Sequence, residues 1–328
     1  MPAPAFWNTG PARRSWQAHL LRPLGAIYAG ATARRLRKGH PHRADIPVIC
    51  VGNLNVGGTG KTPTAMALAM ALGDGVGIVS RGHGGQLTGP VKVDPNQMTA
   101  GDVGDEPLLL SAFAQVWIGR ARDEAVQLAE TDGDLKVIIL DDGFQNPFVH
   151  KDLSIIVVDA QTGFGNGLCL PAGPLREPVA AGLARADLVL SIGDETAQDR
   201  FSETWGNQVT VPRLTGHLAP LQTGMDWTGL PVMAFAGIGR PAKFFQTLRT
   251  LGVDLRDTRA LEDHQPLTPA LMTRLEAEAK AKGAQLVTTE KDAVRLPAEF
   301  RPKVLTVPVR LQIHDWDPLQ ARLTKLGL

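Results

Sequence analysis

The chain has 328 residues, 43% of them hydrophobic and 20% charged, with 34 basic against 33 acidic side chains. This is an ordinary folded composition with room for about two domains, and no stretch reaches the roughly 18 apolar residues of a membrane span, so we expect no transmembrane helix. The cysteines, Cys50 and Cys169, have neither pairing nor metal-ligand spacing. They are interpreted as packing residues in a reducing, cytosolic compartment.

The first 44 residues hold all the excess positive charge. They contain eight Lys or Arg and no acid, which leaves 34 − 8 = 26 bases against 33 acids in the rest of the chain. An apolar stripe at three- and four-residue steps predicts an amphipathic helix on a membrane surface, kinked at Pro23 and Gly25; a helix packed against the body is the alternative. A signal peptide is disfavoured because no uninterrupted apolar core is present, and a nucleic-acid arm because of the stripe itself. The stripe consists of Trp16, Leu20, Leu24, Ile27, Tyr28 and Ala31.

A glycine-rich loop follows the first predicted strand. Residues 46–51 are apolar and β-branched, as in a buried parallel strand, and residues 64–72 are an Ala/Leu/Met helix with Pro63 tolerated in its first turn. In this context the loop predicts a nucleoside-triphosphate site, in which backbone N–H groups surround phosphate oxygens, the lysine reaches the β- and γ-phosphates and the last threonine ligates Mg²⁺. The loop consists of Asn55, Val56, Gly57, Gly58, Thr59, Gly60, Lys61 and Thr62, with Asn55 in place of the usual first glycine.

Apolar runs alternate with helical stretches along the rest of the chain. Short runs at 77–79, 116–118, 137–140, 153–158 and 188–190 follow the first strand at βα spacing, which predicts an α/β fold: a doubly wound, mostly parallel sheet of the P-loop NTPase type. We expect an N-terminal segment at 1–44, a P-loop kinase domain at 45–192, a linker at 193–229 with a short extended piece at 208–211, and a second, smaller α/β domain at 230–328.

Two acids end one of these strands. Residues 137–140 are apolar and lead directly into Asp141 and Asp142. At the carboxyl edge of a parallel sheet a carboxylate can meet the Mg²⁺ that Thr62 would hold, because ligands gather at that edge. The pattern predicts metal-site acids without ranking the two.

Arginines stand beside glycine or proline in three further loops. Arg81, Arg120 and Arg176 each follow a predicted strand. Fixed cations around the sheet edge suit phosphate groups of two substrates. For each single arginine a solvated surface role is equally open.

Seven ordered motifs closely resemble the tetraacyldisaccharide 4′-kinases, the lipid A 4′-kinases of Gram-negative bacteria. The match covers nearly the whole chain, and one departure is His83, where the family typically has tyrosine. The motifs lie at residues 51–63, 80–82, 104–107, 141–145, 171–177, 263–264 and 288–293.

The resemblance implies ATP-dependent, Mg²⁺-dependent phosphorylation of the 4′-hydroxyl of a tetraacylated glucosamine disaccharide 1-phosphate. It implies a peripheral enzyme on the cytoplasmic face of the inner membrane, with no nucleic acid and no obligate protein partner. Asp105 and His264 would orient and deprotonate the sugar hydroxyl, a task that suits a carboxylate–imidazole pair near neutral pH. Asp141 and Asp142 would serve the metal, while Gln145 and the arginines would make supporting contacts.

Two other functions fit the phosphate loop taken alone. A nucleotide-dependent switch or metallocentre-maturation GTPase is disfavoured because residues 289–292 place Lys and Asp side by side, which breaks the spacing of a guanine-specificity motif, and because no Cys/His metal cluster is present in the sequence. A soluble kinase or ligase of an unrelated small metabolite remains an alternative.

Overall fold

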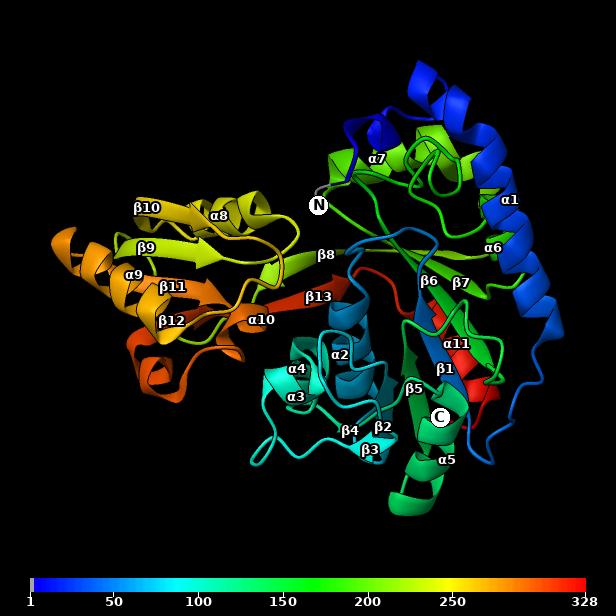
Figure 1. Cartoon of the computed structure of the whole chain (residues 1–328), viewed down its shortest axis with the longest axis horizontal. Helices are drawn as coiled ribbons and strands as arrows, with labels where there is room; N and C mark the ends of the chain where they lie inside the picture. The colour runs from blue at the N-terminus through cyan, green and yellow to red at the C-terminus, as the bar shows by residue number, and fades with distance from the viewer. Residues whose placement is uncertain (1–2) are drawn as a thin grey trace.

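The computed structural model describes residues 3–328, which form two α/β units side by side (Figure 1). The larger unit has a nine-stranded sheet in the order β13-β8-β7-β6-β1-β5-β2-β4-β3, parallel except for β13 and β3. The prediction of a doubly wound, mostly parallel sheet is confirmed. Its strands are β1 (Val48–Gly52), β2 (Val76–Ser80), β3 (Val91–Lys92), β4 (Gln115–Ile118), β5 (Val137–Asp141), β6 (Leu153–Asp159), β7 (Leu188–Ile192), β8 (Arg213–Pro220) and β13 (Val309–Ile313).

The smaller unit, residues 227–307, has a four-stranded parallel sheet in the order β10-β9-β11-β12. Its strands are β9 (Pro231–Ala236), β10 (Asp254–Ala260), β11 (Gln285–Thr289) and β12 (Val304–Val307). The helices of the chain are α1 (Trp16–Lys38), α2 (Lys61–Leu72), α3 (Ala100–Val103), α4 (Asp105–Leu110), α5 (Arg122–Asp132), α6 (Val179–Leu183), α7 (Glu195–Trp205), α8 (Pro241–Thr250), α9 (Pro269–Ala281), α10 (Glu290–Ala293) and α11 (Asp317–Lys325), with 3₁₀ turns η1 (Ala5–Asn8), η2 (Gly206–Gln208) and η3 (Ala298–Lys303).

The segment 193–229, expected as a linker, contains regular structure. Asp194 caps α7 by accepting a hydrogen bond from the Ala197 amide, and β8 pairs with β7 as a full strand of the larger sheet. β8 buries Leu214 and Gly216 while the residues between them are less buried, so its sequence has no continuous apolar run. The short extended piece expected at 208–211 forms no strand: Gln208 is the last residue of η2, and 209–211 are irregular.

The chain also returns to the larger sheet at its end. β13 pairs antiparallel with β8, so residues 309–325 belong to the larger unit and not to the expected domain 230–328. The smaller unit is therefore bounded on both sides by strands of the larger sheet, and β8 and β13 extend toward it in Figure 1.

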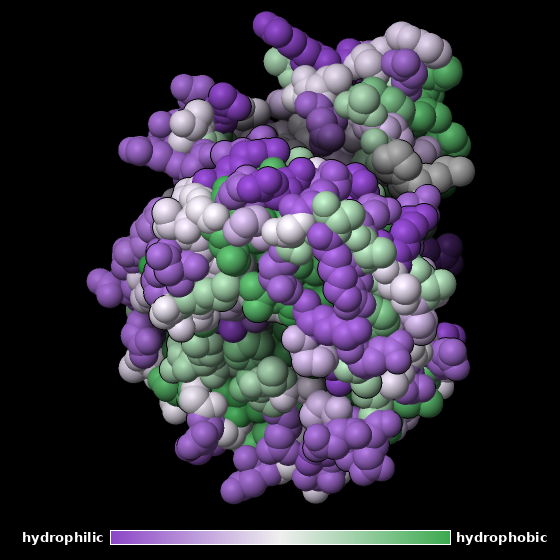
Figure 2. All heavy atoms as spheres, turned by 90° about the vertical axis from the view of Figure 1, so that its left-hand side faces the viewer, coloured by the Kyte–Doolittle hydropathy of each residue, from purple (hydrophilic) through white to green (hydrophobic). Residues whose placement is uncertain are grey.

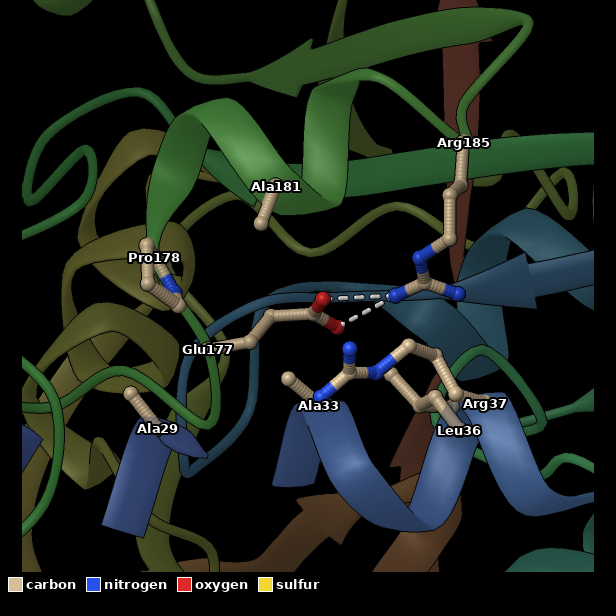
Figure 3. Close-up of a pocket in the computed structure, with 8 residues that line it drawn as sticks. All are labelled: Ala29, Ala33, Leu36, Arg37, Glu177, Pro178, Ala181 and Arg185. Atoms are coloured by element: carbon tan, nitrogen blue, oxygen red, sulfur yellow. Dashed lines mark hydrogen bonds and ion pairs between the residues drawn. The ribbon is translucent and has the colours of Figure 1, made fainter. Parts of the chain in front are cut away.

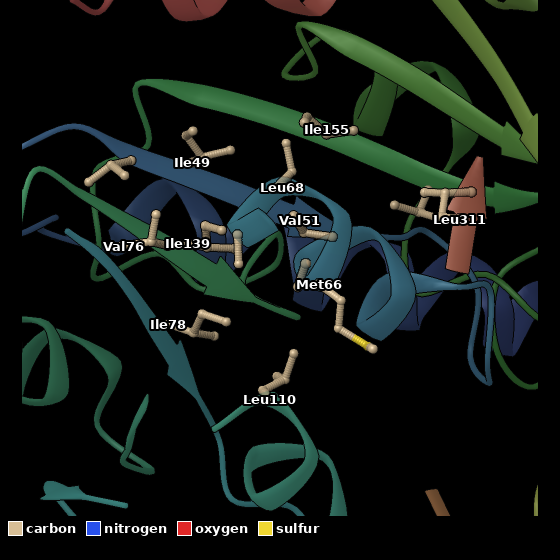
Figure 4. Close-up of a cluster of buried hydrophobic side chains, with 14 of the residues drawn as sticks. Ile49, Val51, Met66, Leu68, Val76, Ile78, Leu110, Ile139, Ile155 and Leu311 are labelled. Carbon is tan, nitrogen blue, oxygen red and sulfur yellow. The ribbon is translucent and has the colours of Figure 1, made fainter. Parts of the chain in front are cut away.

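Each sheet is buried on both faces. In β1, Ile49 and Val51 face one hydrophobic core, and Val48 and Cys50 face the other, as the alternation of a strand requires. Figure 4 shows the first core, where side chains of α2 lie over those of β1 and its neighbouring strands. The smaller sheet likewise separates two buried clusters. These packed layers make the carboxyl ends of the strands a rigid support for loops.

The α1 helix packs through small residues and leaves its apolar stripe exposed. Ala18, Gly25 and Thr32, seven residues apart, are buried, and a Cβ on Gly25 would lie 2.8 Å from the Cys169 carbonyl oxygen. Trp16 and Ile27 are 70% and 69% exposed. The helix runs unbroken through Pro23 and Gly25. The buried face is therefore not the apolar face.

Within residues 3–328 no helix has the length and apolar character needed to cross a bilayer. Figure 2 looks at the end of the molecule formed by the smaller unit, where hydrophilic side chains predominate over most of the surface. Apolar side chains also appear near the top of that view, at the height that α1 and α7 occupy in Figure 1.

Candidate active site

The phosphate loop, residues 55–62, connects the carboxyl end of β1 to α2. Gly57 and Gly60 have φ angles of 109° and 101°, in the left-handed region that glycine adopts without strain. The side-chain amide of the buried Asn53 donates to the Gly57 carbonyl at 3.3 Å and to Thr59 Oγ1 at 3.1 Å. Asn53 thus stabilises the loop. It lies in the motif at residues 51–63, but no role was predicted for it from the sequence.

Asn55, which replaces the usual first glycine, ties the loop to its surroundings. Its Nδ2 donates to the Gly163 carbonyl at 3.0 Å, and its backbone bridges to Leu175. The next amide, that of Val56, donates to the Pro174 carbonyl at 2.8 Å. The 171–178 segment therefore supports one side of the phosphate loop.

Lys61 and Thr62 lie in the first turn of α2, where backbone N–H groups and the helix dipole favour anions. Lys61 Nζ is 3.6 Å from Asp142 Oδ1, and Arg176 Nη1 donates to the same oxygen at 2.9 Å. Although burial opposes ionisation, these two cations hold the pKa of Asp142 below its ordinary value. Asp142 is thus an ionised carboxylate whose charge is balanced by Lys61 and Arg176.

Asp141 lies at the end of β5 and is buried. Its Oδ2 accepts from Ser80 Oγ at 3.1 Å, whereas Oδ1 has no hydrogen-bond partner among residues 3–328. Burial, followed by the charges of Glu106 and Asp142, raises the pKa of Asp141 to about 7. Groups of three or more His, Cys, Asp or Glu side chains placed to hold a metal are absent from the described chain. Mg²⁺ does not require such a group when substrate phosphates and water supply most of its ligands.

Asp105 and His264 come together from the two units. Asp105, 4% exposed, begins α4, and its Oδ2 is 2.9 Å from His264 Nδ1, although the direction is not that of a hydrogen bond. His264 has a φ of 59°, and its second nitrogen lies 3.8 Å from Asp263 Oδ1. The His83 ring lies edge-on to that of His264, 6.2 Å between centroids.

Glu106 connects this pair to the phosphate loop. Its Oε1 accepts from Lys291 Nζ at 2.9 Å, across the two units. Burial opposes ionisation, but the nearby charges of Lys291, Lys61 and His264 together hold the pKa of Glu106 below its ordinary value. Glu106 and Lys291 were noted in the sequence only as members of motifs; adjacency to Asp105 was the available signal.

The predicted supporting residues divide into two groups. Arg176 contacts both Asp142 and Gln145 Oε1, and Gln145 donates to the Asn53 carbonyl and to the buried Glu177. Arg81 and Arg120, in contrast, have exposed side chains at the ends of β2 and β4.

In the loop of Arg120, Arg122 is the buried arginine. Its Nη1 donates to the Gly119 carbonyl at 2.7 Å, and burial lowers the pKa of Arg122 to about 10 despite the charges of Asp141 and Asp142. Arg120 was the one predicted from the sequence. Residue spacing alone does not indicate which of these two arginines is buried.

A small apolar groove lies between α1 and α6. It has a volume of ≈ 200 Å³, and Figure 3 shows the salt-bridged Glu177 and Arg185 on one wall and Arg37 on the other. Arg185 Nη2 donates to Glu177 Oε2 at 2.6 Å. The groove is lined by Ala29, Ala33, Leu36, Arg37, Glu177, Pro178, Ala181 and Arg185.

At one edge of the larger sheet, completed by His264 of the smaller unit, these parts form a site that can receive a phosphate chain and an alcohol. The phosphate loop and α2 offer amides and a lysine, Asp141 offers an oxygen that has no hydrogen-bond partner within residues 3–328, and the Asp105–His264 pair offers a proton acceptor. Such a set suits the transfer of a phosphoryl group to a hydroxyl.

Comparisons with known proteins agree on one family. The family model for tetraacyldisaccharide-1-P 4′-kinase matches residues 17–327. The tetraacyldisaccharide 4′-kinase of Dinoroseobacter shibae is 59% identical over 99% of this chain and 98% of its own, and that of Jannaschia sp. is 58% identical over 99% of each. A crystal structure of LpxK from Aquifex aeolicus in complex with ATP superposes with a TM-score of 0.75 at 25% identity, covering 94% of this chain and 99% of that chain.

Proposed function

The chain belongs to the tetraacyldisaccharide-1-P 4′-kinase family, and from that premise we propose how its residues carry out the reaction. The protein is an ATP-dependent kinase that phosphorylates the 4′-hydroxyl of a tetraacylated glucosamine disaccharide 1-phosphate in lipid A biosynthesis. The single observation that carries the assignment of roles is the Asp105–His264 pair, beside Glu106, at the edge that also bears the phosphate loop.

Asp105 accepts the proton of the 4′-hydroxyl while the hydroxyl oxygen attacks the γ-phosphorus of ATP. The bond from the γ-phosphorus to the β–γ bridging oxygen breaks, and ADP leaves. His264, 2.9 Å from Asp105 Oδ2, orients this carboxylate and stabilises it as a base. A positioned base of this kind contributes ~10²–10⁴-fold to the rate.

The nucleotide phosphates are held by the amides of residues 55–62, with Lys61 at the β- and γ-phosphates. The unpartnered Oδ1 of Asp141, together with Thr62, fits Mg²⁺, while Asp142 is engaged by Arg176 and Lys61 and acts in orientation. The bound cation would neutralise charge on the phosphates. Gln145 and Arg176 hold Asp142 and the loop in register. Arg81 and Arg120, exposed at the ends of β2 and β4, would contact the lipid's own phosphate.

The lipid substrate calls for an enzyme that works at a membrane surface. Each buried CH₂ contributes ~0.8 kcal/mol, so a lipid with four acyl chains stays in the bilayer. The exposed stripe of α1, with Trp16, Leu20 and Ile27 each about 70% exposed, and the arginines beside it suit a peripheral attachment to the cytoplasmic face of the inner membrane. The chain acts there without nucleic acid or an obligate protein partner.

The assignment is tested by transfer of labelled phosphate from ATP to purified tetraacyldisaccharide 1-phosphate. The product is expected to carry label at the 4′-position and to require Mg²⁺. Label that passes equally to soluble alcohols would contradict the lipid specificity.

Attachment is tested with a Leu20→Ser, Ile27→Ser double variant and vesicles that contain anionic lipid. Each lost side chain removes roughly 1.5–3 kcal/mol of burial, so sedimentation with vesicles should weaken by at least ~10-fold. The matched control is Met70→Ser, at a 58% exposed side chain on α2. Equal binding by both variants would show that α1 does not touch the bilayer.

A further inference from the structure

Apart from Lys291, which pairs with Glu106, the motif at residues 288–293 has no role in the site described so far. It forms the end of β11 and the short helix α10, and its Asp292 is fully buried. Asp292 accepts from Thr289 Oγ1 at 2.7 Å and from the Gly237 amide at 3.1 Å, so it fastens α10 to the loop after β9. It also forms an ion pair with Arg295, one turn further on.

Arg295 uses its planar guanidinium to hold the loop that carries His264. Nη1 donates to the Gln265 carbonyl at 2.8 Å, and Nη2 donates to the Gly237 carbonyl at 3.1 Å. The His264 amide donates to that same Gly237 carbonyl at 3.1 Å. The left-handed backbone of His264 is therefore clamped from both sides, which offsets the strain of a positive φ in a residue with a side chain.

The remaining nitrogen of this guanidinium faces the proposed base. Arg295 Nε lies 3.9 Å from Asp105 Oδ2, the oxygen that contacts His264. Both atoms are buried, and neither has a hydrogen-bond partner within residues 3–328. A buried donor and a buried acceptor that face each other unpaired are costly unless they serve another state of the site.

We propose that Arg295 is a positioning residue for phosphoryl transfer, which clamps the His264 loop to α10 and presents Nε to the Asp105 oxygen that faces His264. This inference rests on the proposed function, because it requires Asp105 and His264 to act on the hydroxyl. It differs from a plain structural ion pair, which would stabilise the smaller unit without a specific effect on turnover.

Lysine is the informative replacement. It keeps the positive charge for Asp292 but has a single nitrogen, which cannot reach two carbonyls and Asp105 in the fixed geometry of the fork. We expect Arg295→Lys to lower kcat by roughly 10- to 100-fold through displacement of the pair, while KM for ATP stays within about twofold because the phosphate loop is untouched.

A double-mutant cycle separates positioning from general stability. Arg295→Lys should have a much smaller effect on kcat in a His264→Ala background, because the clamp acts through His264 and only the approach of Nε to Asp105 remains. The matched control is Arg274→Lys. Arg274 pairs with Glu278 on α9 and its side chain is 68% exposed, so this variant should retain wild-type kcat. The assay uses the full-length protein, ATP and the lipid disaccharide 1-phosphate.

Four results would overturn the inference: unchanged kcat in Arg295→Lys, a rise in KM for ATP that accounts for the loss, losses that multiply fully with His264→Ala, or a failure of both Arg295→Lys and Arg295→Gln to fold. A wild-type enzyme that transfers no phosphate to the lipid would instead refute the proposed function. Wild-type turnover is therefore measured first.

Discussion

The phosphate loop and the Asp105–His264 pair lie at two ends of one candidate site, and they are assembled in different ways. The loop consists of consecutive residues that join β1 to α2, held mainly by backbone geometry and by Asn53. The pair joins α4 of the larger unit to a loop of the smaller one, and it depends on α10 and Arg295. The geometry of the phosphate loop is therefore set by one local segment, whereas the geometry of the Asp105–His264 pair depends on the relative position of the two units.

The largest expected effect falls on the end that spans the two units. Asp105→Asn keeps the size of the side chain but removes the proposed base, so kcat should fall by ~10²–10⁴-fold while ATP affinity changes little. Steady-state kinetics together with nucleotide binding measures both. A selective loss of ATP binding would move Asp105 to the nucleotide end and remove the contrast between the two ends.

Substitution in the phosphate loop should affect both kcat and KM for ATP. Lys61→Ala removes the cation that faces the β- and γ-phosphates and that lies 3.6 Å from Asp142. We expect kcat to fall by ~10²–10³-fold and KM for ATP to rise, because the lysine contacts the phosphates in the ground state and holds them more strongly in the transition state. Titration with ATP at saturating lipid checks the split. Unchanged KM would mean that the amides alone bind the nucleotide.

The smallest effect should come from Lys291, which joins the ends through Glu106. In Lys291→Met the half-buried Glu106 loses its partner at 2.9 Å, and kcat should fall roughly threefold to tenfold after allowance for solvent screening. The control is Asp159→Asn, which weakens a different contact between the units, with Arg240 and Lys243. If both variants lose activity equally, the contact between units matters and the position of Lys291 does not.

Much of the fold was predictable because the buried parallel strands consist of continuous runs of apolar residues. β1, β5 and β6 are buried along their whole length and were found in the sequence. β8 was missed because only Leu214 and Gly216 of its residues are buried, β10 because its residues are mostly polar and none is buried, and β13 because only Leu311 of its residues is buried. A strand with one solvated face and no clean alternation has no such signal.

The candidate site was predictable to the same extent. The glycines and lysine of the loop have a local pattern, but the contact between Asp105 and His264 was implied by family resemblance and not by spacing. Arg295 lies two residues beyond the motif at 288–293. Its importance depends on which carbonyls its fork reaches, and these belong to loops that only the folded chain brings together.

The return of β13 to the larger sheet has a consequence for biosynthesis. On the ribosome, β8 emerges with one edge unpaired, and its antiparallel partner appears only after the whole smaller unit has been translated. Until then the nascent chain carries an open edge that can capture other strands. Prompt collapse of the smaller unit shortens that interval, so mutations that slow it should raise aggregation of newly made protein even where the finished enzyme is normal.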